Sequence, residues 1–403
     1  MNVLYISYTG MTDSLGESQV LSYLIQLSVT YKHAFHIVSA EKPKLYSKNR
    51  NRVQSLCDEN SITWHPIVYH KQPPIFSTVA DHLALKKAAF SIARKESIHL
   101  VHCRGYLPML SGIAVKKAFG VPLIFDMRGF WPDEKLESGA WAGYIYKPIF
   151  KYFKKKEVQF FQAADYTVSL THSGKEEIEK AGWIVGEQIG VIPTCVNFGV
   201  FKEFDVATRA TLRAELGISA ETSVLVYSGS LGGNYDPEIP FQIFKGFQLL
   251  DPDAHFLILS RTDPDIVQSY ALDNGVSLKS VSIVSVPFHE VSKYLMVADL
   301  GLVFYGPGYS NKGRSPTKLG EYWATGLPVI SLPNIGDVEA IIRGHPDGGA
   351  IIASTDPQTI YEEINGLPQT TDRSKLRRYA EQYYSLDKGV TFYNNLYKML
   401  GDA

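Results

Sequence analysis

The segment RSPTKLGEY (314–322) has the clearest chemical pattern in the chain. Ser315 is a favourable N-cap and Pro316 suits the first helical position, so we expect a helix that begins at Ser315. The start of a helix presents free backbone N–H groups and the positive end of the helix dipole. We therefore expect the backbone from Ser315 to Thr317 to bind a phosphate group.

Lys318 and Glu321 stand three residues apart, which places them on one face of the first helical turns. Lys318 can neutralise a phosphate, and the Glu321 carboxylate can accept hydrogen bonds from two neighbouring ribose hydroxyls. An ordinary ion pair on a surface helix explains the same two residues. The pattern therefore indicates a nucleotide site, with a surface ion pair as the alternative.

Two glycine-containing turns follow strand-like runs. The turn YSGSLGG (227–233) offers Gly229, Ser230, Leu231 and Gly232, where glycine lets the backbone approach a phosphate closely. It matches neither a Walker loop nor a G-x-G-x-x-G fingerprint, and a plain strand-to-helix turn is the alternative. The turn DSLGESQ (13–19) is its counterpart in the first half. We expect Gly16 there to admit the acceptor or the donor phosphates, with Glu17 beside it.

The segment FDMRGFWPDE (125–134) follows an apolar run and carries a carboxylate and a guanidinium two residues apart. At the end of a strand, the carboxylate of Asp126 can bind a hydroxyl group and the guanidinium of Arg128 can bind a phosphate. A buried Asp–Arg pair that holds the loop is the alternative. Functional carboxylates often need such a partner, so both interpretations can hold together.

Histidines also end strand-like runs, at His102 and His172, and Arg104 follows soon after His102. A lone histidine is more often structural than catalytic. Of the two we place His172 among the candidate catalytic residues, and we place Arg104 on the acceptor side.

Short apolar runs alternate with helical patterns along the chain, which is typical of parallel sheets covered on both faces. About six such units in each half predict two doubly wound α/β domains. We expect one domain over residues 1–200 and a second over 201–385, facing each other across a cleft. The tail 373–400 predicts two helices broken near Leu386, the last of which, about 386–403, packs back on the first domain.

The 40 basic and 41 acidic side chains give a formal charge of −1, which argues against a nucleic-acid binder. The three cysteines lie far apart, with no metal-ligand spacing, and suit a reducing compartment. We also expect no signal peptide and no membrane span. Together these features predict a cytoplasmic protein without a bound metal.

One segment, residues 141–161, mixes aromatic residues with several lysines. Such a stretch can lie on an anionic membrane, here the inner face of the plasma membrane, and recruit a lipid-linked acceptor. An amphipathic helix with a solvated lysine cluster is the alternative. The lysines concerned are Lys147, Lys151, Lys154, Lys155 and Lys156.

At these motifs the sequence resembles the retaining GT-B glycosyltransferases of family 4. The stretch SPTKLGEYWATGLPVI (315–330) looks like their donor-site helix, and YSGSLGG, ADLGLVFYGPG (298–308), NIGDVEAII (334–342), DSLGESQVL, FDMRGFWPDE and VIPTCVNF (191–198) are similar in the same order. The resemblance spans nearly the whole chain. It implies the GT-B fold, with residues 1–200 binding the acceptor and residues 201–385 binding a nucleotide-sugar donor, and it implies no cofactor. In many relatives a histidine or an acid at the position of Asp126 contacts the reacting sugar, so the resemblance assigns Asp126 to the sugar or acceptor hydroxyl and Arg128 to the phosphates. It does not give the base or the sugar of the donor.

Glu321 matches the second glutamate of the family's paired-glutamate motif, which binds the donor ribose. Gly313 stands where the first glutamate belongs, and backbone amides near Ser315 or the side chain of Lys312 are possible replacements. The family's basic pair is also absent from GGNYDPEIP (232–240). Arg261 and Lys318 remain as ligands for the diphosphate.

In this family the nucleotide base meets backbone groups just before a helix such as the one expected at His289, which points to Val286 and His289. The resemblance also implies an oxocarbenium-like transition state, with the charge on the departing phosphate stabilised by cationic side chains and a helix start.

We therefore predict a retaining glycosyltransferase of bacterial surface-polysaccharide or glycoconjugate assembly, with a glycan or polyprenyl-linked acceptor. One alternative is a sugar-nucleotide epimerase or hydrolase of the same fold, and another is a catalytically silent nucleotide-sugar-binding protein. A nicotinamide dehydrogenase is disfavoured because no G-x-G-x-x-G motif opens either half.

Overall fold

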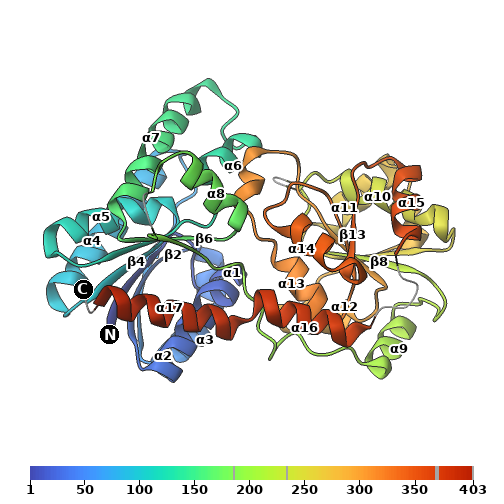
Figure 1. Ribbon diagram of the computed structural model, residues 1–403, viewed down its shortest axis with the longest axis horizontal. Coiled ribbons are helices and arrows are strands. Elements are labelled where there is room, and N and C mark those ends of the chain that lie inside the picture. The colour runs from blue at the N-terminus through green and yellow to red at the C-terminus, as the bar shows by residue number, and fades with distance from the viewer. Residues whose placement is uncertain (185–186, 233–234, 368–371, 402–403) are drawn as a thin grey trace. The chain divides into compact units, whose positions relative to one another are not determined.

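The computed structural model describes residues 1–184, 187–232, 235–367 and 372–401 (Figure 1). The chain divides into two compact units. Unit 1 comprises Met1–Asp133, Gly143–Pro193 and Leu386–Ala403, and unit 2 comprises Glu134–Ala142 and Thr194–Ser385. Each unit contains one parallel sheet with helices on both faces, so the predicted α/β class is confirmed.

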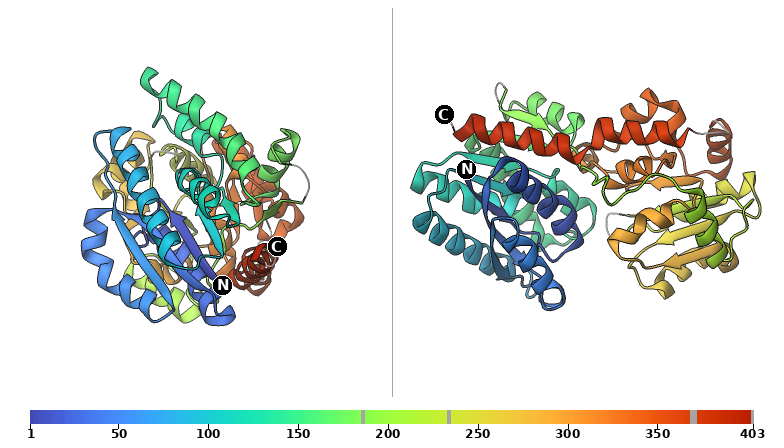
Figure 2. Two further views of the ribbon diagram at one scale, coloured as in Figure 1. Left: turned by 90° about the vertical axis from the view of Figure 1, so that its left-hand side faces the viewer. Right: turned by 90° about the horizontal axis from the view of Figure 1, so that it is seen from below.

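Unit 1 is built on a seven-stranded sheet in the order β3-β2-β1-β4-β5-β6-β7. Its elements in chain order are β1 (Asn2–Ser7), α1 (Ser14–Gly16), η1 (Glu17–Leu21), α2 (Ser22–Tyr31), β2 (Ala34–Glu41), α3 (Pro43–Asp58), β3 (Ile62–Val68), α4 (Phe76–Lys95), β4 (Leu100–Arg104), α5 (Tyr106–Phe119), β5 (Leu123–Asp126), the start of α6 (Trp131–Glu137, which belongs to unit 2 from Glu134 on), η2 (Tyr144–Tyr146), α7 (Lys147–Ala163), β6 (Tyr166–Ser169), α8 (His172–Lys180), β7 (Ile189–Val191) and α17 (Leu386–Gly401). Helices α4, α5 and α7 cover one face, whereas α2 and α17 lie against each other on the sheet's other face (Figure 2).

Unit 2 is built on a six-stranded sheet in the order β10-β9-β8-β11-β12-β13. Its elements in chain order are α9 (Val206–Glu215), β8 (Val224–Ser228), α10 (Ile239–Leu250), β9 (His255–Leu259), α11 (Pro264–Asp273), η3 (Leu278–Ser280), β10 (Val281–Val284), η4 (Phe288–Glu290), α12 (Val291–Leu295), β11 (Leu300–Val303), η5 (Tyr309–Gly313), α13 (Thr317–Ala324), β12 (Val329–Ser331), α14 (Val338–Gly344), η6 (Pro346–Gly348), β13 (Gly349–Ile351), α15 (Pro357–Asn365) and α16 (Arg373–Tyr384).

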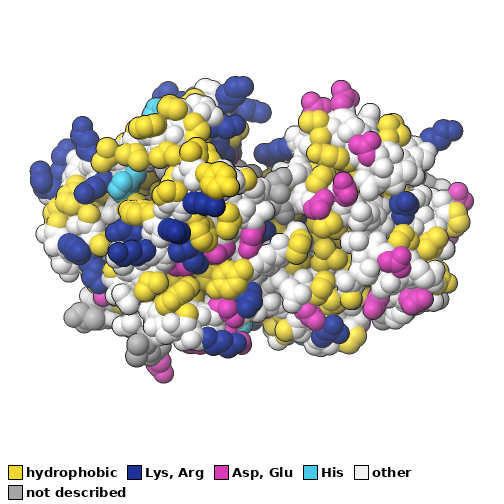
Figure 3. Space-filling model, turned by 90° about the horizontal axis from the view of Figure 1, so that it is seen from above, with side chains coloured by type: hydrophobic (Ala, Val, Ile, Leu, Met, Phe, Trp, Pro, Cys, Tyr) yellow, Lys and Arg dark blue, Asp and Glu magenta, His cyan; other side chains and the backbone are white. Residues whose placement is uncertain are grey.

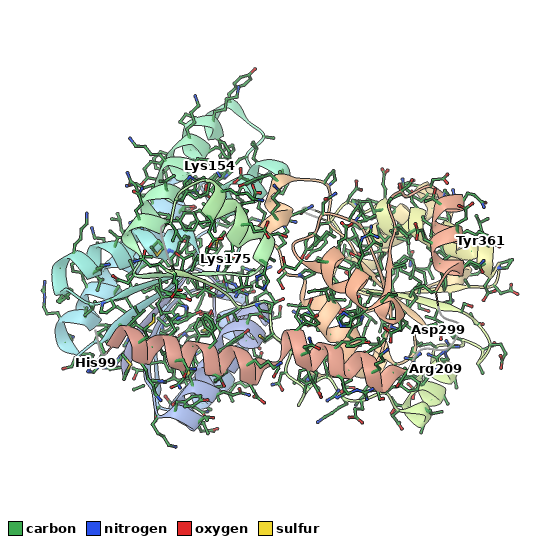
Figure 4. All side chains as sticks on the ribbon, in the orientation of Figure 1. His99, Lys154, Lys175, Arg209, Asp299 and Tyr361 are labelled. Atoms are coloured by element: carbon green, nitrogen blue, oxygen red, sulfur yellow. The ribbon has the colours of Figure 1, made fainter. Side chains whose placement is uncertain are left out.

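Alternate side chains along the strands of unit 2 enter two separate cores. Val224 and Val226 pack on one side of the sheet, and Leu225 and Tyr227 pack on the other. Strands buried on both faces read as continuous apolar runs, which is why the sequence pattern identifies them. At the amino edge of this sheet, Arg209 of α9 forms an ion pair with Asp299 at 2.5 Å (Figure 4).

The sequence pattern misses one strand, β3, because the apolar runs of the first half lie at 3–7, 35–40, 97–103, 121–127, 166–170 and 190–194. It lies at the edge of its sheet, alternates buried and exposed residues, and contains Pro66. Proline is tolerated in an edge strand because the missing N–H faces no further strand. The tail does form two helices, α16 and α17, and α17 packs against α2 and β4 within unit 1.

In both sheets the strand order reverses beside the first strand of the unit, between β1 and β4 and between β8 and β11. Ligands of doubly wound sheets bind outside the carboxyl ends of the strands at this reversal. The residues that follow β1, β4 and β5 in unit 1, and β8 and β11 in unit 2, are therefore where the functional groups should be sought.

Candidate functional site

The helix predicted at Ser315 exists, but it begins two residues later. In α13 the N-cap position is occupied by Pro316, with extended backbone and no side-chain cap. The Ser315 hydroxyl instead accepts a hydrogen bond from the Thr194 N–H at 3.2 Å, and the Thr194 hydroxyl donates to the Ser315 carbonyl at 2.8 Å. The prediction of a Ser315 cap is wrong because this side chain is engaged with Thr194, which leaves the first amides of α13 uncapped.

Lys318 is buried, with 7% of its surface exposed, although it is charged. Its ammonium lies 5.3 Å from the ring centre of Tyr227 and 4.5 Å from that of Tyr235. A side chain at Gly229 would place its Cβ 2.9 Å from the Lys318 Cε. The structure thus brings the predicted lysine and the predicted glycine turn together, and Gly229 is needed there so that the lysine can lie against the turn.

No carboxylate forms an ion pair with Lys318 in the part of the chain that the structure describes. Aromatic faces stabilise an ammonium group by cation–π attraction, but they do not cancel its charge. A buried cation that lacks an anionic partner is a favourable place for a phosphate.

A second cation, Arg314, lies in the same cluster and was not among the predicted site residues. Its guanidinium is 4.6 Å from the ring centre of Tyr305. The rings of Tyr305 and Tyr235 are stacked at 5.0 Å, and the Tyr235 hydroxyl donates to that of Tyr305 at 3.4 Å. Burial raises the pKa of Tyr235, but the Lys318 ammonium outweighs it and leaves that pKa below its usual value. The spacing of Arg314 and Lys318, four residues apart, is the feature of the sequence that could have revealed Arg314. Tyr235 and Tyr305 come from distant loops, so the sequence does not show that they lie beside these cations.

Glu321 lies on α13 one turn after Lys318 and is partly buried. Burial raises the pKa of its carboxyl to about 7, although the charge of Lys318 acts in the opposite direction. The helix itself is firmly held: the Tyr322 hydroxyl accepts a hydrogen bond from the Ser228 N–H at 2.9 Å, and the Trp323 indole donates to the Gly348 carbonyl at 2.9 Å. Glu321 is therefore held in place by its helix, and its carboxyl has a pKa of about 7.

The other predicted donor-site residues also follow the carboxyl ends of strands in unit 2. Ser230 accepts a hydrogen bond from the Tyr227 hydroxyl through its carbonyl, and the Leu231 N–H donates to the Thr262 hydroxyl at 3.1 Å. Gly232 has a φ of 94°, which favours glycine. Residues 233–234 of this turn lie outside the described residues.

Three further predicted residues, Arg261, Val286 and His289, follow β9 and β10. Arg261 and His289 are exposed, and the His289 ring lies 3.5 Å from the neighbouring Glu290 carboxylate. Gly313, the position of the missing first glutamate, is a buried residue at the end of η5. Near it, Glu137 accepts a hydrogen bond from the Ser310 N–H at 3.1 Å, which fixes the loop before η5.

In unit 1 the predicted pair Asp126 and Arg128 does form, at the end of β5. Asp126 is 2% exposed, and its carboxylate lies 3.7 Å from the Arg128 guanidinium and 3.9 Å from the His102 ring. Burial raises the pKa of Asp126, but Arg128 and His102 outweigh it and hold that pKa below its usual value. The carboxylate is therefore ionised and serves as the counter-ion of this cluster.

Arg128 has a φ of 58°, a conformation that a large side chain rarely adopts, and Gly129 follows with a φ of 103°. Strained backbone persists only where its surroundings enforce it, and it is concentrated at functional positions. A small pocket beside this turn is lined by the side chains of Asp126, Arg128, His102 and four tyrosines, namely Tyr5, Tyr23, Tyr393 and Tyr397. The last two come from α17, and the Tyr397 hydroxyl is 2.8 Å from the His102 Nδ1.

Arg104, predicted on the acceptor side, is close to the same cluster and donates to the Thr9 hydroxyl at 3.2 Å. Its buried Nε has no hydrogen-bond partner among the described residues. Burial lowers the pKa of His102, so that ring is neutral. Two guanidinium groups thus face a single carboxylate, and the cluster has excess positive charge. His172, by contrast, is an exposed residue at the start of α8.

The structure gives a local reason for Gly16, and its contact with a ligand stays a prediction. A Cβ at Gly16 would lie 1.9 Å from the Gly10 carbonyl oxygen, so the missing side chain makes room for the protein's own backbone. Glu17 is held in an ion pair with Arg52 at 2.6 Å. The buried Glu41 carboxylate fixes this turn through the N–H groups of Met11, at 2.7 Å, and Thr12, at 3.1 Å.

Comparison with known proteins matches residues 19–199 to the family model described as Glycosyltransferase Family 4. No curated protein matches the sequence. Among solved structures, the chain resembles Alr3699/HepE from Anabaena, in a complex with UDP and glucose, with a TM-score of 0.70 at 13% identity, covering 98% of this chain and 99% of that one. The fold is also similar to sucrose-phosphate synthase from Thermosynechococcus elongatus, with a TM-score of 0.71 at 14% identity and 99% of each chain covered. A glycosyltransferase from Rickettsia africae ESF-5 gives a TM-score of 0.68 at 13% identity, covering 99% of this chain and 98% of that one.

At such low identity these structures show the fold alone, and it is the two-domain GT-B fold that the sequence predicts. The family model matches residues 19–199, which is a little less than half of the chain. The chain therefore has the GT-B fold, and residues 19–199 of it are similar to the model of Glycosyltransferase Family 4.

Proposed function

We propose that this protein is a retaining, metal-independent glycosyltransferase that moves a sugar from a nucleotide-sugar donor to a glycan or polyprenyl-linked acceptor, in the assembly of a bacterial surface polysaccharide or glycoconjugate. The observation that carries the proposal is Lys318, a buried ammonium without a carboxylate partner among the described residues, directly beside the Gly229 turn. A diphosphate would supply the missing negative charge.

The proposal gives each group of unit 2 a defined task. The uncapped amides of α13, together with Lys318 and Arg314, bind the diphosphate and stabilise the charge that develops on it as the sugar leaves. Arg314 takes the place of the family's missing basic pair. The Glu321 carboxylate, with a pKa of about 7, accepts hydrogen bonds from the ribose. The leaving phosphate itself takes the proton of the acceptor.

In unit 1 we assign Asp126 to holding Arg128 and to the sugar or acceptor hydroxyl, and Arg128 to a phosphate. Arg104 and His172 remain proposals for the acceptor side and for catalysis. HepE holds UDP and UDP-glucose in its solved structures, so UDP is the first nucleotide to test here, with GDP and CMP alongside.

A thermal-shift screen with UDP, GDP and CMP tests donor binding, because a ligand of the folded state raises its melting temperature. Lys318→Met should weaken binding of the chosen diphosphate about ten- to hundredfold, the effect of losing a charge-assisted hydrogen bond. It should change binding of the bare nucleoside little. Lys245→Met, which removes an exposed lysine of α10, is the matched control. Equal loss for nucleoside and diphosphate would contradict the role given to Lys318.

Transfer is tested with the chosen sugar nucleotide, with and without a glycan acceptor, by following the release of nucleotide and the anomeric configuration of the product. Release that depends on acceptor, with retention, is expected. Release that ignores the acceptor would favour the epimerase or hydrolase alternative. Tight donor binding without any product would favour a silent binding protein.

We also propose peripheral membrane association through residues 147–156. Lys154 is not part of that surface, because its ammonium lies 2.8 Å from the Asp133 carboxylate and forms an ion pair with the buried Glu157 (Figure 4). Among the described residues no helix combines the length and the apolar character needed to span a bilayer.

A further inference from the structure

Helices α4, α5 and α7 form one layer on the sheet of unit 1, with α5 packed against both of the others. The acidic side chains within these three helices are Asp81 and Glu157, and both are buried. Asp81 accepts hydrogen bonds from Tyr8 and His70, and Glu157 from Tyr106. The outer surface of this layer therefore carries no exposed carboxylate of its own.

Basic side chains, in contrast, are exposed along the same layer. Lys116 is neutralised by Asp165 at 2.7 Å, just beyond α7, and Lys154 is engaged as described above. The exposed ones are Lys86, Lys87, Arg94, Lys95, Lys117, Lys147, Lys151 and Lys155. In a chain with a formal charge of −1, this concentration makes one face of unit 1 strongly positive. Figure 3 shows Lys and Arg side chains interspersed with hydrophobic ones on the side of the molecule where α7 lies.

The start of α4 is apolar on its outer face as well. Phe76, Val79 and Leu83 follow one another at helical spacing and are 76%, 53% and 58% exposed. The inner face of the same helix is already occupied, because Leu85 and Ala89 pack into the core of unit 1. The outer stripe is therefore left out of the core of unit 1, and an exposed apolar stripe of this kind marks a surface for a partner.

A second exposed apolar group stands just before α7, where Tyr144 and Ile145 are 84% and 67% exposed. Helices α4 and α7 each lead directly into a parallel strand, so their C-terminal ends lie at the amino edge of the sheet and their N-terminal ends at the carboxyl edge. Both apolar groups thus lie toward the edge that carries the candidate site.

We infer that this layer is a docking surface for an anionic lipid bilayer. The side chains of the stripe Phe76–Val79–Leu83 insert among the headgroups, and the lysines of α4 and α7 contact the anionic headgroups. Apolar side chains flanked by basic ones suit the interfacial region of such a membrane. A second copy of the chain fits less well, because a symmetric interface sets the same patch against itself and would bring lysines against lysines. A nucleic acid fits less well too, since Val79 and Leu83 offer bases no stacking surface.

The inference goes beyond the surface proposed on α7, because the inserted element lies on α4. Docking at the carboxyl edge would bring a lipid-linked acceptor to the strand ends of unit 1. It does not depend on sugar transfer, since binding to vesicles needs neither donor nor acceptor. Failure of one proposal is therefore distinguishable from failure of the other.

The test is co-sedimentation of the full chain with vesicles of phosphatidylcholine alone and of equal parts phosphatidylcholine and phosphatidylglycerol. We expect binding to the anionic vesicles only, and release by salt. F76S/V79S/L83S should weaken that binding by at least about tenfold, because these side chains lose their burial in the membrane. K86E/K87E should weaken it by about fivefold or more for each lysine.

Matched controls come from unit 2, where Leu249 and Leu272 are 52% and 58% exposed. L249S/L272S and K245E should leave vesicle binding unchanged. Wild-type protein that stays in the supernatant with anionic vesicles, or an α4 triple variant that pellets like wild type, would overturn the inference. So would dimerisation in sedimentation velocity that the same triple variant abolishes in the absence of lipid, since it would assign the stripe to a second copy.

Discussion

Replacement of Glu321 by glutamine should change stability and donor binding in opposite directions. In the protein without ligand, burial raises the pKa of this carboxyl from 4.5 to about 7, so the ionised form is unfavourable in the folded state. Glutamine has the same shape and no charge to desolvate. We therefore expect Glu321→Gln to stabilise unit 2 while it weakens binding of the nucleotide, because an amide offers the ribose a single acceptor oxygen.

The size of the effect follows from the shift in pKa. The folded state binds the proton of Glu321 more tightly than the unfolded chain does. The free-energy cost of ionising Glu321 in the folded state is therefore absent below pH 4, grows as the pH rises and is complete above the folded pKa. The glutamine variant should gain about 1 kcal/mol near pH 5 and about 3 kcal/mol near pH 8. For a unit of this size, the larger figure corresponds to roughly 5–10 °C in melting temperature.

The assay is urea unfolding of both proteins at a series of pH values, with calorimetric titration of the nucleotide on the same samples. Glu339→Gln is the control, because Glu339 forms a surface ion pair with Arg343 at 3.0 Å on α14 and should contribute less than about 1 kcal/mol. A gain for Glu321→Gln that does not grow with pH, or a loss of stability at every pH, would refute the burial of an ionisable carboxyl at this position. Unchanged nucleotide affinity would refute its contact with the ribose.

Gly229→Ala should lower both the melting temperature and the nucleotide affinity, because its Cβ would lie 2.9 Å from the Lys318 Cε and its φ of 151° disfavours a side chain; an affinity equal to wild type would show that the lysine does not bind at this turn. Asp126→Asn should cost about 3 kcal/mol in urea unfolding at neutral pH, since it leaves Arg128 buried without its counter-ion. Because the pKa of Asp126 is lowered in the folded state, its contribution in the wild type is present at neutral pH and is lost as acid protonates the carboxyl; a cost that persists in acid would contradict the ion pair. Tyr322→Phe should cost about 1–3 kcal/mol by leaving the Ser228 N–H without its acceptor, and chemical denaturation that shows no change would mean that this amide finds another partner.

The sheet topology is predictable from the sequence because its strands are buried on both faces. In unit 2 every expected run becomes a strand, and the side chains of neighbouring positions enter opposite cores. In unit 1 the half-exposed edge strand β3 carries no such run, so it goes unseen. A continuous apolar run thus identifies a strand that is buried on both faces, and a strand that is only partly buried is not predicted.

The candidate site is predictable only where its residues are close in sequence. The pairs Lys318–Glu321 and Asp126–Arg128 are read directly from their spacing. The ring of Tyr235 beside Lys318 stacks on that of Tyr305, which is 70 residues away in the sequence, and no periodicity joins the two. Gly16 shows a limit of this approach, since a glycine needed for a close backbone contact looks the same in sequence as one that admits a ligand.

The two strand edges share one electrostatic property, although their residues differ. At the end of β5, Arg104 and Arg128 outnumber the carboxylate of Asp126, and the neighbouring His102 is held neutral by burial. Beside β8, Lys318 has no ion-paired carboxylate among the described residues, and Glu321 on the next turn has a pKa of about 7 and so is only partly ionised. Folding alone gains nothing from buried positive charge in excess, because each desolvated cation costs free energy unless an anion neutralises it. The excess lies beside the strand-order reversal of each sheet, where doubly wound folds bind their ligands. A substrate with negative charge offsets this cost at either edge, and that is the physical reason to expect phosphate there rather than a neutral sugar alone.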